Sequence, residues 1–123
     1  MTLMAREAFE ALVEQAFDEL PPELAARVSN VDVVVQDLPG PESAGASVGA
    51  GALLLGLYQG IPLTQRGDWY SAVLPDRITI YQANIERVAG SPEAIPAIVR
   101  RTVIHEFAHH FGIDDARLAE LGW

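Results

Sequence analysis

All three histidines of the chain lie between residues 105 and 110, in a segment that contains the pattern His-Glu-x-x-His. An α-helix turns by about 100° per residue, so His105 and His109 would lie on one helical face about one turn apart, where both imidazoles can reach a single metal ion. Glu106 would lie beside that ion without binding it, which suits a base that takes a proton from metal-bound water. The spacing therefore predicts a metal site on a helix.

A third ligand is expected just after this helix. Gly112 suits the left-handed conformation that commonly ends a helix. The three residues after it span at most about 10 Å, which is enough to bring the Asp115 carboxylate back to the face that carries the two histidines. The expected ligands are therefore His105, His109 and Asp115, with a fourth position open for water, as in catalytic zinc sites.

Some alternatives remain for the residues near this site. A turn one residue tighter would exchange Asp114 for Asp115, and Glu120 lies further downstream. His110 would point about 100° away from His109, so we expect it to pack or to cap carbonyls rather than to catalyse. A purely structural role for the whole motif is disfavoured, because the added glycine and aspartate make a chance match rarer.

The motif resembles the active-site helix of the zincin metallopeptidases, in the form in which a glycine turn precedes the third ligand. Metzincins place histidine at that third position, whereas snapalysin-type peptidases carry aspartate there, so Asp115 matches the latter by position. More of the chain resembles the minimal zincin-like family of short bacterial proteins. The residues behind this resemblance are 54–63 (LLGLYQGIPL), 74–81 (LPDRITIY) and 105–112 (HEFAHHFG). No methionine follows Asp115, so the methionine turn of the metzincins is absent.

The resemblance implies a zinc-dependent hydrolase, a metallopeptidase with one Zn²⁺ per chain that acts on a peptide or protein substrate. Glu106 would take the proton from bound water and return it to the leaving amine. A metal-binding sensor or partner module without turnover is the main alternative, and a domain whose histidines only pack is another. The same ligand types also suit iron, cobalt or nickel. Tyr58, Tyr70 and Tyr81 could each stabilise an oxyanion, and none is assigned to that role.

Length and composition restrict the class of protein. The chain has 123 residues, of which 50% are hydrophobic and 20% charged, as expected for one globular domain over residues 1–123. Its net charge of −9 argues against a nucleic-acid partner. It has no cysteine, an acidic rather than apolar amino-terminal segment and no long apolar run, so we expect a cytoplasmic protein without a membrane partner. The oligomeric state stays open.

The elements that must position the motif can be predicted from periodicity. The predicted fold is α+β, with a small mixed sheet of about three strands. The sheet would pack on an amino-terminal amphipathic helix and on the carboxy-terminal helix that carries the motif. The expected helices cover residues 9–20, from about Ile95 through the motif, and 114–121, with Ser91 as a capping residue before the second.

Three strands are expected from the remaining apolar segments. They cover residues 30–36, 53–58 and 77–81, and the first of them reads as buried on both faces near its end. Pro62, just after the second strand, indicates a sheet edge, and residues 53–60 are a candidate for pairing with an extended substrate. Residues 39–52 are expected to form a loop, and whether that loop is a lid is left open.

Overall fold

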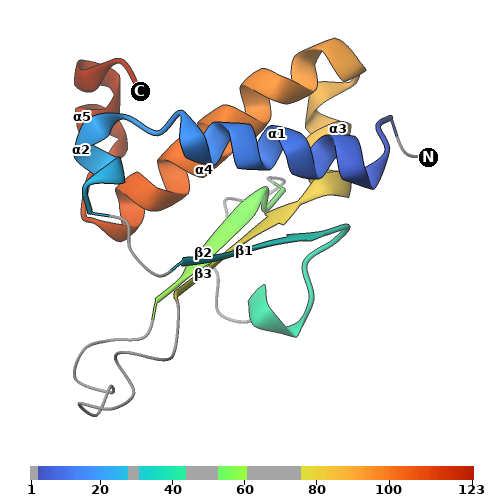
Figure 1. The fold of residues 1–123 in the computed structure, drawn as a ribbon, viewed down its shortest axis with the longest axis horizontal. Coiled ribbons are helices and arrows are strands. Elements are labelled where there is room, and N and C mark those ends of the chain that lie inside the picture. Colours follow the sequence, from blue (N-terminus) through green and yellow to red (C-terminus); the bar gives the residue numbers. More distant parts are fainter. Residues whose placement is uncertain (1–2, 28–30, 44–52, 61–75) are drawn as a thin grey trace.

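The computed structural model of the chain describes residues 3–27, 31–43, 53–60 and 76–123 and is drawn in Figure 1. Within these ranges the elements, in chain order, are the helices and strands α1 (Arg6–Asp18), α2 (Pro22–Ala25), β1 (Val31–Gln36), the 3-10 turn η1 (Pro41–Ser43), β2 (Gly56–Gln59), β3 (Asp76–Tyr81), α3 (Gln82–Ala89), the 3-10 turn η3 (Pro92–Ala94), α4 (Ile95–His110) and α5 (Asp115–Leu121). The three strands form one mixed sheet, so the predicted α+β fold is confirmed.

The sheet has the strand order β1-β3-β2, with β3 in the centre. β1 runs parallel to β3 and places Val33 opposite Ile78, whereas β2 runs antiparallel to β3 and places Tyr58 opposite Ile78. The central strand buries Ile78 and Ile80 almost completely. Among the described residues, β1 and β2 are therefore the two edges of the sheet.

α1 and α4 lie against each other on one side of the sheet, as Figure 1 shows. α1 is amphipathic as predicted, although it begins three residues earlier and ends two residues earlier than the expected range 9–20, and it buries Phe9, Val13 and Ala16 against the core. α4 buries residues along its whole length, namely Ile95, Val99, Thr102, Val103, Ile104, Phe107 and Ala108. The helix that carries the histidines is thus held by the hydrophobic core from its first turn to its last.

The start of α4 agrees with the prediction in its position but not in its cap. The regular helix begins at Ile95 as predicted, and Pro96 lies in its first turn, where a missing N–H is tolerated. The expected cap was wrong, because the Ser91 hydroxyl makes no capping hydrogen bond in front of η3. Packing of the helix against the core, rather than a side-chain cap, therefore holds this end.

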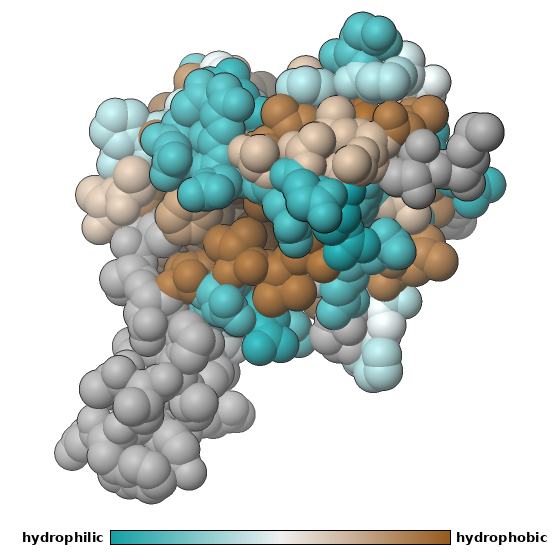
Figure 2. All heavy atoms as spheres, turned by 45° about the vertical axis from the view of Figure 1, so that its right-hand side comes forward, coloured by the Kyte–Doolittle hydropathy of each residue, from teal (hydrophilic) through white to brown (hydrophobic). Residues whose placement is uncertain are grey.

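β1 departs from the prediction that it is buried on both faces. As an edge strand it leaves Val33 37% exposed, and its neighbours are only partly covered. Together with α1 it lines a groove that combines the apolar side chains of Val31, Val33, Val35, Val13 and Phe17 with the carboxylates of Glu10, Glu14 and Asp18. Figure 2 shows that apolar side chains do reach the surface on the face drawn there, in a band bordered by polar ones.

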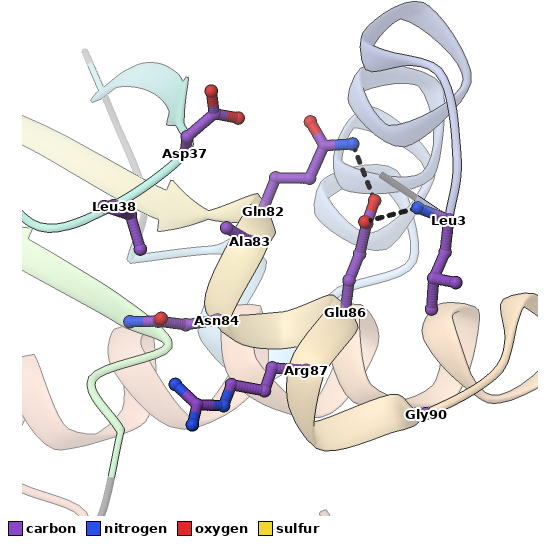
Figure 3. A pocket seen from close by; sticks show the side chains of 9 residues that line it. All are labelled: Leu3, Asp37, Leu38, Gln82, Ala83, Asn84, Glu86, Arg87 and Gly90. Carbon is purple, nitrogen blue, oxygen red and sulfur yellow. Dashed lines mark hydrogen bonds between the residues drawn. The ribbon is translucent and has the colours of Figure 1, made fainter. Parts of the chain in front are cut away.

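α3 was not predicted, because polar residues occupy part of its buried face. Gln82, Asn84 and Glu86 are all nearly inaccessible to solvent. Figure 3 shows two of their hydrogen bonds: the Glu86 carboxylate accepts from the Leu3 amide at 2.7 Å and from the Gln82 side chain at 2.8 Å. This network ties the amino-terminal segment to α3 beside a hollow of about 650 Å³.

Some predictions fall on residues that the structure does not describe. Residues 61–63, Tyr70 and most of the predicted loop 39–52, with its possible role as a lid, lie outside the described ranges. In the described part of the chain, no helix is long and apolar enough to cross a membrane.

Candidate metal centre and active site

His105 and His109 lie one turn apart on α4, with their ring centroids 5.9 Å from each other. The opposite side of the helix is fixed by buried residues such as Val103 and Phe107, so the two imidazoles are presented by a backbone that is packed in place. His105 is partly buried, while the His109 side chain is 44% exposed. One end of the cluster is therefore held in the fold and the other opens to solvent.

The turn after α4 has the geometry predicted from its glycine. Gly112 has a φ of 84°, and the amides of Gly112 and Ile113 donate to the carbonyls of His109 and Ala108 at 3.0 and 2.9 Å. These two bonds are the Schellman arrangement, which reverses the chain sharply after a helix. The chain is thereby turned back toward the histidines of α4.

The two aspartates that follow have different contacts. Asp114 is the N-cap of α5, and its Oδ1 accepts a hydrogen bond from the Arg117 amide at 2.9 Å. Asp115 instead turns toward α4, where its Oδ1 lies 2.8 Å from His109 Nε2. One ligand-type atom from each of His105, His109 and Asp115 lies within 4.8 Å of the other two.

This donor set fits zinc. Two imidazole nitrogens and one carboxylate oxygen are typical of catalytic zinc sites, with bonds of about 2.0–2.2 Å. Donor atoms within 4.8 Å of one another can converge on an ion by modest side-chain rotation. Glu120 lies outside this cluster and pairs with Arg117 at 2.9 Å.

Glu106 is anchored by a backbone group that the sequence did not identify. Its Oε1 accepts a hydrogen bond from the Tyr58 amide of β2 at 3.1 Å. Burial raises the pKa of the Glu106 carboxyl, and this effect outweighs the lowering by the Tyr58 amide and by the charge of His109. The carboxylate therefore lies in a partly desolvated position next to the histidine cluster.

Gly56 explains why β2 can come this close to α4. A Cβ at Gly56 would lie 2.9 Å from Cγ2 of Thr102, a distance that real side chains do not tolerate. The absence of a side chain lets the strand rest on the helix, which brings the Tyr58 amide within reach of Glu106. Sequence reasoning had no signal for this contact, since it joins backbone to side chain across 48 residues.

The other candidate residues lie elsewhere. The Tyr58 hydroxyl donates to Asp76 Oδ2 at 2.9 Å, and Tyr81 is completely buried. His110 packs as expected, with its ring stacked on Tyr58 at 3.9 Å between centroids. Neither of these tyrosines is assigned to the oxyanion.

A hollow of about 460 Å³ adjoins the cluster. It is lined by His105, Glu106, His109, Thr102, Arg101 and Ile98 of α4, Val88 of α3, and Leu53, Leu54, Leu55 and Gly56. Its wall on the β2 side is held by Asn84, whose side-chain amide donates to the Leu54 carbonyl at 2.9 Å. The larger hollow beside Glu86 is lined by none of the three histidines and carries no comparable set of groups.

The mixed sheet, the helix beneath it and the histidine cluster on that helix define a protein of the zincin class. The sequence profile of the zincin-like metallopeptidases matches residues 28–123, so the chain belongs to the zincin-like metallopeptidase family. This membership confirms the resemblance seen in the sequence, and it implies a metal-dependent hydrolase whose metal is typically zinc.

A solved structure supports the same fold. The chain is similar to a conserved hypothetical protein (TTHA0227) from Thermo thermophilus, with 27% identity and a TM-score of 0.58. The match covers 95% of this chain and 99% of that protein. A comparison with curated proteins finds no match.

Proposed function

We propose that this protein is a zinc metallopeptidase in which His105, His109 and Asp115 hold one Zn²⁺ and Glu106 is the general base. The observation that carries the proposal is the convergence of the three ligand-type atoms within 4.8 Å. The turn at Gly112 supports it further, because that turn directs Asp115 rather than Asp114 toward His109.

A bound zinc ion would supply Lewis acidity, which polarises a substrate carbonyl and makes water easier to deprotonate. The proton transfers are carried out by a residue of the chain. Glu106 takes a proton from the attacking water and later delivers it to the leaving amine. The raised pKa of Glu106 suits this role, because a group that must first accept and then donate a proton works best when its pKa lies closer to the working pH.

The substrate would lie along β2. The Tyr58 amide points out of the sheet toward Glu106, and because peptide groups alternate along a strand, those of Gly56 point outward as well. The Leu54 carbonyl is already bonded to Asn84. Gly56 itself is buried against Thr102 of α4, so we expect an extended peptide to lie beside this strand in the hollow lined by Leu53, Leu55 and Ile98 rather than to pair with Gly56.

Hydrolysis of a mixed peptide library tests the proposal. Zinc-loaded wild type should cleave some members, and Glu106→Gln should lower the rate by about 10²–10⁴-fold while keeping the metal, because it removes the base but no ligand. Mass spectrometry of the products and zinc analysis of both proteins give the two readouts. If wild type binds zinc and cleaves nothing, the alternative of a metal-binding sensor or partner module replaces the peptidase.

A further inference from the structure

The position of the general base depends on one backbone amide. Tyr58 N–H holds Glu106 Oε1 at 3.1 Å, so a displacement of Tyr58 would displace the carboxylate. β2 is an edge strand of four residues with a single neighbouring strand among the described residues. Such a short edge strand has few ladder hydrogen bonds of its own, and other contacts must therefore fix Tyr58.

Within the described part of the chain, side chains from β3 and α4 contact the Tyr58 side chain. Its hydroxyl donates to Asp76 Oδ2 at 2.9 Å, which ties it to the start of β3. Its ring packs in a T-shaped arrangement with that of Phe107, a core residue of α4, at 5.3 Å between centroids. Its face stacks on the imidazole of His110, with centroids 3.9 Å apart and planes inclined by 26°. The partly buried ring thus contacts both the last turns of α4 and the start of β3.

The backbone after β2 is also shaped around His110. A Cβ at Gly60 would lie 2.6 Å from Cε1 of this imidazole, so only glycine fits unless His110 moves. His110 Nε2 also lies 4.0 Å from Asp76 Oδ2, the atom that accepts the Tyr58 hydroxyl. His110 therefore packs between the Tyr58 ring and the chain at Gly60, and it is not one of the residues that offer atoms to the metal cluster.

We propose that His110 is a positioning residue for the general base: by stacking on Tyr58 it fixes the amide that holds Glu106. This inference rests on the proposed function, since it gives Glu106 a catalytic role. His110 acts here through packing alone. An error of about 1 Å in the placement of a catalytic group can lower a rate by about 100-fold. The contact between His110 and Tyr58 can therefore affect the rate, although neither side chain takes part in the reaction.

A purely structural role for His110 makes different predictions. If His110 only stabilises the fold, its removal lowers the melting temperature but leaves the folded, zinc-loaded enzyme with a normal kcat. If His110 positions Glu106, kcat falls in the folded protein while KM and zinc affinity stay close to wild type. Protection of the Tyr58 amide against hydrogen exchange then falls as well, because its bond to Glu106 is weakened.

The test compares His110→Ala with His110→Phe, both loaded with zinc and assayed well below their melting temperatures. We expect His110→Ala to lower kcat about 10- to 100-fold, with KM and the zinc dissociation constant within about threefold of wild type. His110→Phe keeps an aromatic ring on Tyr58 and should recover most of kcat and of the Tyr58 amide protection. Arg100→Ala, at an exposed position on the same helix, is the matched control and should change none of these quantities.

The outcomes separate the two proposals. A normal kcat and normal Tyr58 protection in His110→Ala would overturn the positioning role, and loss of zinc from both variants would instead make His110 part of the metal site. If His110→Ala does not fold, His110→Leu replaces it, because leucine fills space without offering an aromatic face to Tyr58; it should lower kcat and Tyr58 amide protection in the same way, and normal values of both would overturn the positioning role. If wild type cleaves no peptide, the peptidase proposal fails. Amide exchange in His110→Ala, compared with Glu106→Ala, still decides whether His110 holds the Tyr58–Glu106 contact.

Discussion

At the scale of single residues, Asp114 and Asp115 are neighbours with different surroundings. The Asp114 carboxylate accepts the Arg117 amide at the start of α5, whereas the Asp115 carboxylate contacts His109. A cap contributes to helix stability and a metal ligand contributes to metal affinity, so the two residues can be told apart by substitution.

We expect Asp115→Ala to weaken zinc binding by more than about 100-fold, which exceeds the usual effect of losing a partner of a ligand. Asp114→Ala should leave zinc affinity nearly unchanged and lower the free energy of unfolding by about 0.5–2 kcal/mol, because it removes only the cap. Zinc titration and denaturant unfolding of both variants measure the two effects. Loss of zinc from Asp114→Ala with retention by Asp115→Ala would show that the assignment is wrong by one residue.

How much of the site the sequence could predict depends on how local each contact is. The spacing of His105 and His109 follows from the helical repeat, and the turn at Gly112 follows from backbone sterics, so both could be anticipated. The partner of Glu106 could not, because the Tyr58 amide comes from a strand 48 residues away and any residue type carries an amide. The sequence predicted that His110 packs or caps carbonyls, but it did not identify Tyr58 as the ring on which His110 stacks.

At the scale of elements, the reversal after α4 depends on a residue with positive φ. Gly112 and Gly90 have φ values of 84° and 72°, and a Cβ would meet open space at both positions. Substitution by alanine should therefore cost only backbone strain, about 1–2 kcal/mol at either position. The two glycines differ in the segments that they introduce, since only Gly112 leads to Asp115.

We expect Gly112→Ala and Gly90→Ala to lose similar stability, but only Gly112→Ala to lose zinc affinity, by up to about tenfold. The reason is that the strained turn can relax in the metal-free protein, so zinc binding must restore it, and about 1.4 kcal/mol corresponds to a factor of ten. Unfolding curves and zinc titrations of both variants provide the comparison. Equal zinc affinities in the two variants would mean that the turn does not set the position of the third ligand.

The helices with a clear apolar periodicity were predicted well, whereas the elements whose burial depends on contacts with distant segments were not. α1 and α4 bury the stripes that their sequences indicate. α3 was missed because the buried polar groups of Gln82 and Glu86 are satisfied by distant parts of the chain, which a local pattern cannot reveal. The burial of β1 was overestimated because its run of valines resembles a central strand, while the strand order places it at an edge.

At the scale of the whole molecule, the candidate site draws on segments that are far apart in the sequence. Tyr58 of β2 contacts Glu106 of α4, and Asp115 at the start of α5 completes the cluster with the two histidines. The fold class could be predicted from the number and type of elements, whereas the strand order β1-β3-β2 could not, because periodicity does not specify which strands are neighbours. The cytoplasmic location, the single domain over residues 1–123 and the absence of a nucleic-acid or membrane partner stay predictions.

Zinc content per chain is the most direct test of the account, since every proposed role depends on the metal. Wild type reloaded with zinc and freed of excess should hold one ion per chain by elemental analysis. His105→Ala and His109→Ala should hold none. His110→Ala, which removes the adjacent imidazole from the same helix, should still hold one. A wild-type protein that stays empty after reloading, or a His105→Ala protein that keeps a full equivalent, would contradict the assignment of the metal centre.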